Sequence, residues 1–135
     1  MAEFIMKKSV VQAGLADQFL IESAATSSEE LGNPVYPPVV RLLNSYGISC
    51  KGKTARQIRR DDYAKYDLLI GMENLNIRNM LRIFGEDPEH KIHLLLDWTD
   101  TPGDIDDPWY SRDFEGAYRQ IEKGCLALLD TYRNF

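Results

Sequence analysis

The sequence has little cysteine and little histidine, and each shortage excludes a class of protein. Among its 135 residues are two cysteines and two histidines. Cys50 and Cys125 lie far apart and predict neither a disulfide framework nor a metal site, so we expect no metal and no cofactor. The apolar runs at residues 68–70 and 92–96 are far too short to span a bilayer. The N-terminus lacks the basic-then-apolar order of a signal peptide, and we expect a cytoplasmic protein.

An excess of basic charge is missing as well. The formal net charge is −5 at pH 7, which gives no global positive field to attract nucleic acid or an anionic membrane. We therefore expect neither as a partner. Hydrophobic residues make up 44% of the chain and charged residues 27%, the balance of a soluble globular protein. Repeats and low-complexity tracts are absent, and the length predicts a single domain over residues 1–135.

Apolar periodicity predicts four helices, because apolar residues recur at i, i+3, i+4 and i+7. Prolines suit the first turn of one helix, and glycines follow the last turn of two. In the first helix, Ile5 and Val11 are expected on the same side. The expected helices are residues 1–13, a helix from Pro37-Pro38 to Gly47, residues 74–84, and residues 114–132.

Three short apolar stretches lie between these helices, at residues 19–21, 68–72 and 92–95. Their continuous hydrophobicity is typical of strands that are buried on both faces of a parallel sheet. Strands that alternate with helices predict an α/β layer architecture. The start is unusual, since an α/β domain of this kind ordinarily opens on a strand and this chain opens on a helix.

Five short motifs, in order and at matching spacing, resemble the low-molecular-weight protein-tyrosine phosphatase family. They are Ser23-Ala24-Ala25-Thr26, Gly32-Asn33-Pro34, Thr54-Ala55-Arg56-Gln57, the segment from Tyr66 to Met72, and Asp106-Asp107-Pro108-Trp109-Tyr110. The resemblance runs from Met1 to about Tyr132. It implies a doubly wound, mostly parallel sheet flanked by helices. One tetrapeptide would carry little weight, but five in sequence make a chance match very unlikely.

In that family the chemistry is carried by a loop of the form Cys-x5-Arg-Ser, between the first strand and the first helix. Backbone N–H groups and the helix dipole hold a phosphate there and stabilise the nucleophilic thiolate. Residues 1–4 resemble the helix that follows this loop. We therefore expect residues 1–135 to be a truncated domain that lacks its first central strand and the nucleophile, and to be inactive alone.

The acid side of the family's site is present. By resemblance, Asp107 is the general acid that protonates the leaving phenolate and then, as a base, activates the water. Trp109 and Tyr110 would line a slot for the phosphotyrosine ring, and Ser23 would orient the cysteine loop. The implied substrate is a phosphotyrosine protein or a small aryl phosphate, provided the loop is restored.

Two positions depart from the family pattern, and one segment matches the nucleophile motif only formally. Glu73 follows Met72 where relatives carry aspartate, and Lys53 stands where many carry a histidine that supports the loop. The segment from Cys50 to Arg56 formally matches Cys-x5-Arg, but Gln57 replaces the expected serine and no buried strand precedes it. We interpret Cys50 as an ordinary buried or loop cysteine, and Cys125 as a core residue of the last helix.

Other functions are compatible with this pattern. A non-catalytic pseudophosphatase would use the remaining cleft or an exposed sheet edge to bind a partner. A relative that acts on phosphoarginine or arsenate is a further alternative, although Trp109 and Tyr110 favour an aryl phosphate. Without the central strand, an open sheet edge would expose unpaired backbone groups, which predicts self-association.

Overall fold

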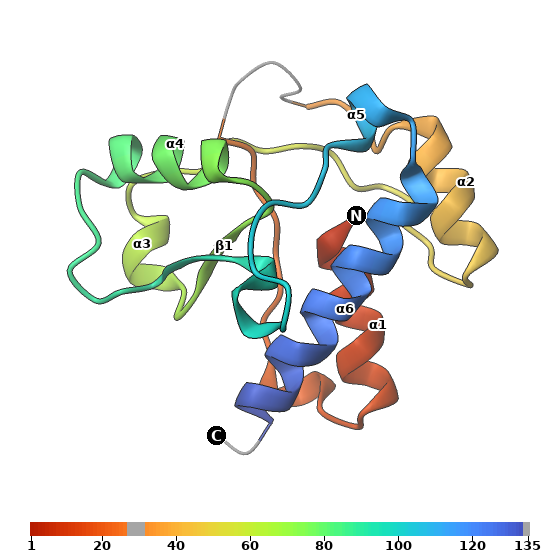
Figure 1. The fold of residues 1–135 in the computed structure, drawn as a ribbon, viewed down its shortest axis with the longest axis horizontal. Helices are drawn as coiled ribbons and strands as arrows, with labels where there is room; N and C mark the ends of the chain where they lie inside the picture. The colour runs from red at the N-terminus through yellow and green to blue at the C-terminus, as the bar shows by residue number, and fades with distance from the viewer. Residues whose placement is uncertain (27–31, 134–135) are drawn as a thin grey trace.

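A computed structural model describes residues 1–26 and 32–133 (Figure 1). Four long helices lie where periodicity predicts them. The shorter helices between the long elements were not predicted from the sequence. The long helices are α1 (Ala2–Gln12), α2 (Pro37–Ser45), α4 (Asn74–Phe84) and α6 (Phe114–Tyr132), and the shorter ones are α3 (Asp62–Lys65), α5 (Pro108–Ser111), η1 (Ala16–Gln18) and η2 (Leu95–Trp98).

The sheet in the described residues consists of two parallel strands, β1 (Leu69–Gly71) and β2 (Ile92–Leu94). Leu69 pairs with Ile92 and Gly71 with Leu94, and α4 forms the crossover between the strands. In Figure 1, α1 and α6 lie on one side of β1, with α3 and α4 on the other. This layered arrangement confirms the α/β prediction with a parallel sheet.

The expected strand at residues 19–21 is not formed within the described part of the chain. Phe19 is extended, with φ −129° and ψ 127°, but residues 19–24 form no ladder with β1. Leu20 is 69% exposed, contrary to the prediction that both faces of this stretch are buried. The nearest pairing is an isolated bridge in which Ala25 N–H donates to the Arg56 carbonyl at 2.7 Å. Extended backbone becomes a strand only where a neighbour supplies hydrogen bonds.

The core lies between α1, α2 and α6. Ile5, Leu43, Tyr118 and Cys125 are its most deeply buried large side chains. Tyr46 stacks on Tyr118, with ring centroids 4.0 Å apart and planes 8° from parallel. This stacking joins the end of α2 to α6, and Ile5 packs α1 into the same core.

The end of β1 and the start of α4 are in close contact. A Cβ atom at Gly71 would lie 2.8 Å from Cβ of Asn76, so only glycine permits this approach. Glu73 and Asn76 then form a reciprocal capping box at the helix start. The turn that carries Glu73 is therefore fixed relative to the carboxyl end of the sheet.

Candidate active site

Asp107 immediately precedes α5, in a stretch that we call the acid segment (residues 104–113). Its side chain is exposed, and its backbone carbonyl accepts a hydrogen bond from Ser111 N–H at 3.3 Å. Together with Asp106 it lines a pocket of about 420 Å³. The remaining lining residues are Glu73, Asp104, Ile105 and Ser111. An exposed carboxylate beside a pocket has the access that proton transfer to a bound substrate requires.

The N-terminal side of the acid segment is held by α4 and the turn before it. Ile105 N–H donates to the Met72 carbonyl at 2.9 Å. Asp104 Oδ1 accepts from the backbone and side-chain nitrogens of Asn74, at 2.9 and 2.8 Å. These bonds anchor the segment two residues before Asp107, so the backbone there is fixed although its carboxylates are exposed.

Trp109 and Tyr110 belong to α5, which directly follows Asp107. Their side chains lie outside what the structure describes, so their expected place in the substrate slot stays a prediction. The backbone of α5 puts both residues within one helical turn of Asp107.

Ser23 contacts a carboxylate in the first turn of α1. Its Oγ donates to Glu3 Oε1 at 2.6 Å, and Lys53 Nζ contacts the same oxygen at 2.8 Å. Lys7 Nζ contacts the other oxygen, Oε2, at 2.6 Å. Ser23 and Lys53, both selected from the sequence, thus meet at a residue that the sequence analysis did not select. The sequence gives little sign of this role, because a Glu–Lys pair four residues apart is ordinarily a surface feature of a helix.

Glu3 is a buried carboxylate that remains charged. Its side chain is 4% exposed. Burial by itself would raise the pKa of Glu3, but hydrogen bonds from Lys53, Lys7 and Ser23 outweigh it and lower the pKa to about 2. The three donors come from α1, the extended segment after η1, and the loop before α3. Glu3 therefore ties three separate parts of the chain together.

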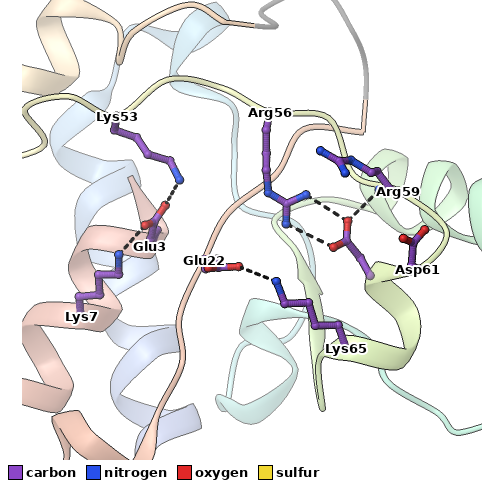
Figure 2. A pocket seen from close by; sticks show the side chains of 9 residues that line it. Glu3, Lys7, Glu22, Lys53, Arg56, Arg59, Asp61 and Lys65 are labelled. Atoms are coloured by element: carbon purple, nitrogen blue, oxygen red, sulfur yellow. Dashed lines mark hydrogen bonds and ion pairs between the residues drawn. The ribbon is translucent and has the colours of Figure 1, made fainter.

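A second pocket, of about 500 Å³, opens beside Glu3, and we call it the charged pocket (Figure 2). Figure 2 shows Lys53 and Lys7 directed at Glu3, and Lys65 directed at Glu22. All nine lining residues are charged: Glu3, Lys7, Glu22, Lys53, Arg56, Arg59, Asp61, Asp62 and Lys65. Its basic and acidic groups largely pair with one another, which indicates a structural role rather than a site for an anionic substrate.

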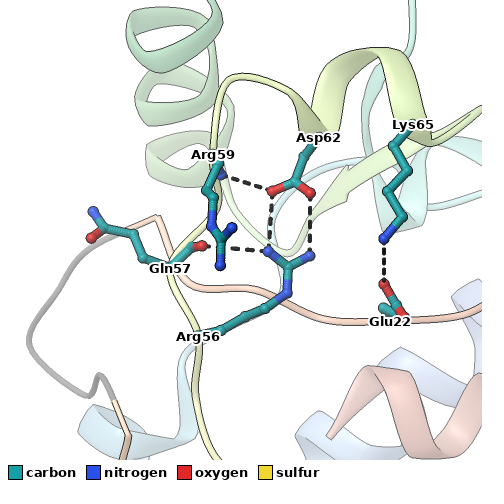
Figure 3. Close-up of polar contacts among 6 residues, drawn as sticks. All are labelled: Glu22, Arg56, Gln57, Arg59, Asp62 and Lys65. Atoms are coloured by element: carbon teal, nitrogen blue, oxygen red, sulfur yellow. Dashed lines mark hydrogen bonds and ion pairs between the residues drawn. The ribbon is translucent and has the colours of Figure 1, made fainter.

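Arg56 is held by Asp62 in a two-pronged contact (Figure 3). Its Nη1 lies 3.1 Å from Oδ2 of Asp62, and its Nη2 lies 3.4 Å from Oδ1. Asp62 also accepts from Arg59 N–H at 2.7 Å. Burial would raise the pKa of Asp62, but the hydrogen bonds from Arg59 and Arg56 lower it overall. The guanidinium of Arg56 is thus occupied by a carboxylate and is not presented to a phosphate.

The two cysteines belong to the core. Cys50 is 6% exposed and packs in the main apolar cluster, which agrees with its interpretation as a buried residue and not a nucleophile. Cys125 is 1% exposed, and burial raises the pKa of its thiol to about 12. A thiol with such a pKa is protonated at neutral pH and unreactive.

In the described ranges, no cluster of three or more His, Cys, Asp or Glu side chains has the geometry to hold a metal ion. Across the same ranges, no helix combines the length and apolarity needed to cross a membrane.

The whole chain resembles one family. The family model for low molecular weight phosphotyrosine protein phosphatase matches residues 1–134. The chain is 31% identical over 131 residues to low molecular weight protein-tyrosine-phosphatase YfkJ of Bacillus subtilis, an alignment that covers 96% of this chain and 84% of YfkJ. It is 33% identical over 134 residues to the low molecular weight phosphotyrosine protein phosphatase of Rattus norvegicus, which covers 96% and 84% of the two chains.

Solved structures give the same answer for the fold. The crystal structure of YfkJ superposes with a TM-score of 0.93 at 30% identity, over 98% of this chain and 85% of YfkJ. The low molecular weight protein tyrosine phosphatase SP-PTP of Streptococcus pyogenes has a TM-score of 0.85 at 36% identity, over 97% of this chain and 82% of that chain. Sequence and fold agree along nearly the full length, and the chain therefore belongs to the low molecular weight phosphotyrosine protein phosphatase family.

Proposed function

We propose that this chain supplies the acid side of a protein-tyrosine phosphatase site, and that the nucleophile comes from a segment outside residues 1–135. The observation that supports the acid role is the placement of Asp107. Its carboxylate is exposed beside a pocket, on a backbone that is held to α4 through residues 104 and 105. The substrate class is a phosphotyrosine protein or a small aryl phosphate, with Trp109 and Tyr110 against its ring.

The reaction has two steps. A cysteine thiolate attacks phosphorus, the bond between phosphorus and the phenolic oxygen breaks, and Asp107 gives its proton to the leaving phenolate. A water molecule then attacks the phosphocysteine and transfers its proton to Asp107. Inorganic phosphate leaves and the thiolate is regenerated. Asp107 begins and ends protonated, so no further reactant is needed.

Ser23 has a supporting part in this proposal. Its hydroxyl is bound to Glu3 in the first turn of α1, next to the place where the nucleophile loop would join the helix. A serine held in this way is suited to orient the loop and not to react. Lys53 binds the same carboxylate and keeps it charged.

The proposal is tested by comparing two proteins. We expect residues 1–135 alone to give no turnover of an aryl phosphate, since neither cysteine lies in an anion-binding loop. The same chain, extended at its N-terminus by an apolar strand and a Cys-x5-Arg-Ser loop, should hydrolyse the substrate. Hydrolysis by residues 1–135 that disappears in Cys50→Ser would restore Cys50 as the nucleophile and refute the proposal.

A non-catalytic binding role is the alternative outcome of this comparison. An extended chain that folds, binds inorganic phosphate and still gives no turnover would support a pseudophosphatase. An extended chain that hydrolyses phosphoarginine faster than an aryl phosphate would show that the substrate class is phosphoarginine.

A further inference from the structure

The C-terminal side of the acid segment is anchored by a contact that the sequence analysis did not foresee. Arg112 Nη1 donates to the Tyr36 hydroxyl at 3.0 Å. Tyr36 immediately precedes α2, and its carbonyl accepts from Val39 N–H and Val40 N–H at 2.9 and 3.0 Å. The contact therefore joins the turn that carries Asp107 to the fixed first turn of α2, 76 residues away in sequence.

The backbone at Arg112 is shaped for this contact. Its φ is +62°, in the left-handed region that favours glycine. Arg112 N–H closes α5 by donating to the Pro108 carbonyl at 2.8 Å, and α6 begins two residues later. An arginine at a position that favours glycine needs a compensating contact, and the hydrogen bond to Tyr36 supplies one.

Tyr36 is itself held by α6. Its ring lies 6.0 Å from the ring of Phe114, the first residue of that helix. Asp113 caps α6 by accepting from Gly116 N–H at 2.9 Å. The end of the acid segment is thus fixed to α2 through Arg112 and to α6 through Asp113.

We propose that Arg112 is a positioning residue, which acts through its hydrogen bond to Tyr36 to hold α5 and hence the Asp107 carboxylate at a set distance from α2. The inference rests on the proposed function of Asp107. With residues 104 and 105 held by α4, the Arg112–Tyr36 bond fixes the far side of the same short segment. The acid is then held between two anchors, and its access to a leaving group depends on both.

Hydrogen exchange on the chain of residues 1–135 tests the anchor directly. Arg112→Ala and Tyr36→Phe should each speed exchange of the Ser111 and Arg112 amides by about 2- to 10-fold, the factor that corresponds to one net hydrogen bond. The double variant should add little, because both changes remove the same bond. Arg112→Lys should partly restore protection. Arg119→Ala, which removes an exposed arginine on α6, is the matched control and should change nothing.

Kinetics of the extended chain then separate positioning from simple stabilisation. Arg112→Ala and Tyr36→Phe should lower kcat for poor leaving groups more than for good ones, because only the former need a well-placed acid. Unchanged exchange in both variants would overturn the inference, and so would faster exchange with an equal effect on all leaving groups. An inactive extended chain with faster exchange would instead refute the proposed function of Asp107 and leave the anchor as a structural contact.

Discussion

The acid segment and the charged pocket use carboxylates in opposite ways. In the acid segment, Asp106 and Asp107 are exposed and line a pocket, on a backbone that is held to α4 through residues 104 and 105. In the charged pocket, Glu3 and Asp62 are buried, and their oxygens are fully engaged by lysine, arginine and serine donors. A carboxylate held by several donors has a lowered pKa and cannot readily accept a proton. A carboxylate on a fixed but exposed turn keeps access to a substrate.

This difference assigns separate tasks to the two regions. The charged pocket joins α1 to the segments around Ser23 and Lys53, and so contributes to stability and alignment. The acid segment is proposed to carry the chemistry. Substitution of Glu3 in the first region should therefore change unfolding, and substitution of the exposed Asp107 in the second should change turnover with little change in unfolding.

Asp107→Asn in the extended chain should produce the largest effect. Loss of a general acid and base lowers kcat by about 10²- to 10⁴-fold. Phosphate affinity should barely change, since the loop binds the phosphate. Asp106→Asn is the matched control, an adjacent exposed aspartate in the same pocket, and should retain most activity. Equal losses in the two variants would indicate a general effect of charge and remove the acid role from Asp107.

Glu3→Ala should cause the largest loss of stability. It leaves Ser23 and Lys53 without their shared acceptor, and a lost hydrogen bond to a charged group costs about 1.5–3 kcal/mol. Urea unfolding measures the change. Glu89→Gln removes an exposed carboxylate, 64% accessible, beside Lys91 and should cost less than about 0.5 kcal/mol. Similar losses for the two variants would contradict the difference between buried and exposed pairs.

The stabilising effect of Glu3 should depend on pH. The pKa of Glu3 is about 2 in the folded chain, against an ordinary value of 4.5. Its contribution is therefore complete above about pH 4.5 and is lost as the pH falls toward 2. The difference in unfolding free energy between the wild type and Glu3→Gln should shrink across this range. A difference that stays constant from about pH 6 to pH 3 would show that the charge of Glu3 does not stabilise the fold.

Self-association through the extended segment is a further prediction. Residues 19–24 form no ladder with β1 in the described chain, and Leu20 is 69% exposed beside these backbone groups. Light scattering should give a mass that rises with concentration. Leu20→Lys should weaken association at least roughly tenfold, whereas Leu126→Lys, at a leucine 51% exposed on α6, should not. A concentration-independent monomer with a sharp, high-midpoint unfolding transition would contradict this expectation.

The smallest effect is expected at the margin of the charged pocket. Lys65 Nζ lies 3.9 Å from Glu22 Oε2, and their side chains are 60% and 39% exposed. Such pairs are worth little because water screens them, so Lys65→Met should change the unfolding free energy by less than about 0.5 kcal/mol. A loss above about 1 kcal/mol would mean that the pocket acts as one cooperative network up to its edge.

Helix positions could be predicted from the sequence because their signals are local. The apolar repeat located α6, and glycine at positions 47 and 85 marked the ends of α2 and α4. The pattern failed where burial depends on distant partners. Val11 was expected with Ile5 on one side of α1 but is 64% exposed, whereas the charged Glu3 is buried. The repeat of apolar residues along a helix cannot predict the partners of Glu3 that lie 20 and 50 residues away in sequence.

The family could be predicted from the sequence motifs and is confirmed. The roles of Asp107 and Ser23 in the site stay predictions. The strand expected at residues 19–21 was wrong, since a sheet requires pairing partners that an apolar run cannot reveal. The Arg112–Tyr36 contact was also missed. The positive φ of Arg112 marks this contact, but it is a property of the folded backbone and cannot be read from the sequence.

The acid role of Asp107 is tested most directly by the dependence of kcat on the pKa of the leaving phenol, measured for the extended chain and its Asp107→Asn variant. If Asp107 protonates the leaving group, kcat of the unaltered protein should vary little with that pKa. The variant should slow steeply as the phenol becomes less acidic, and should approach the unaltered protein for the best leaving groups. Parallel dependences, with the same loss for good and poor leaving groups, would contradict the assignment of Asp107 as the acid.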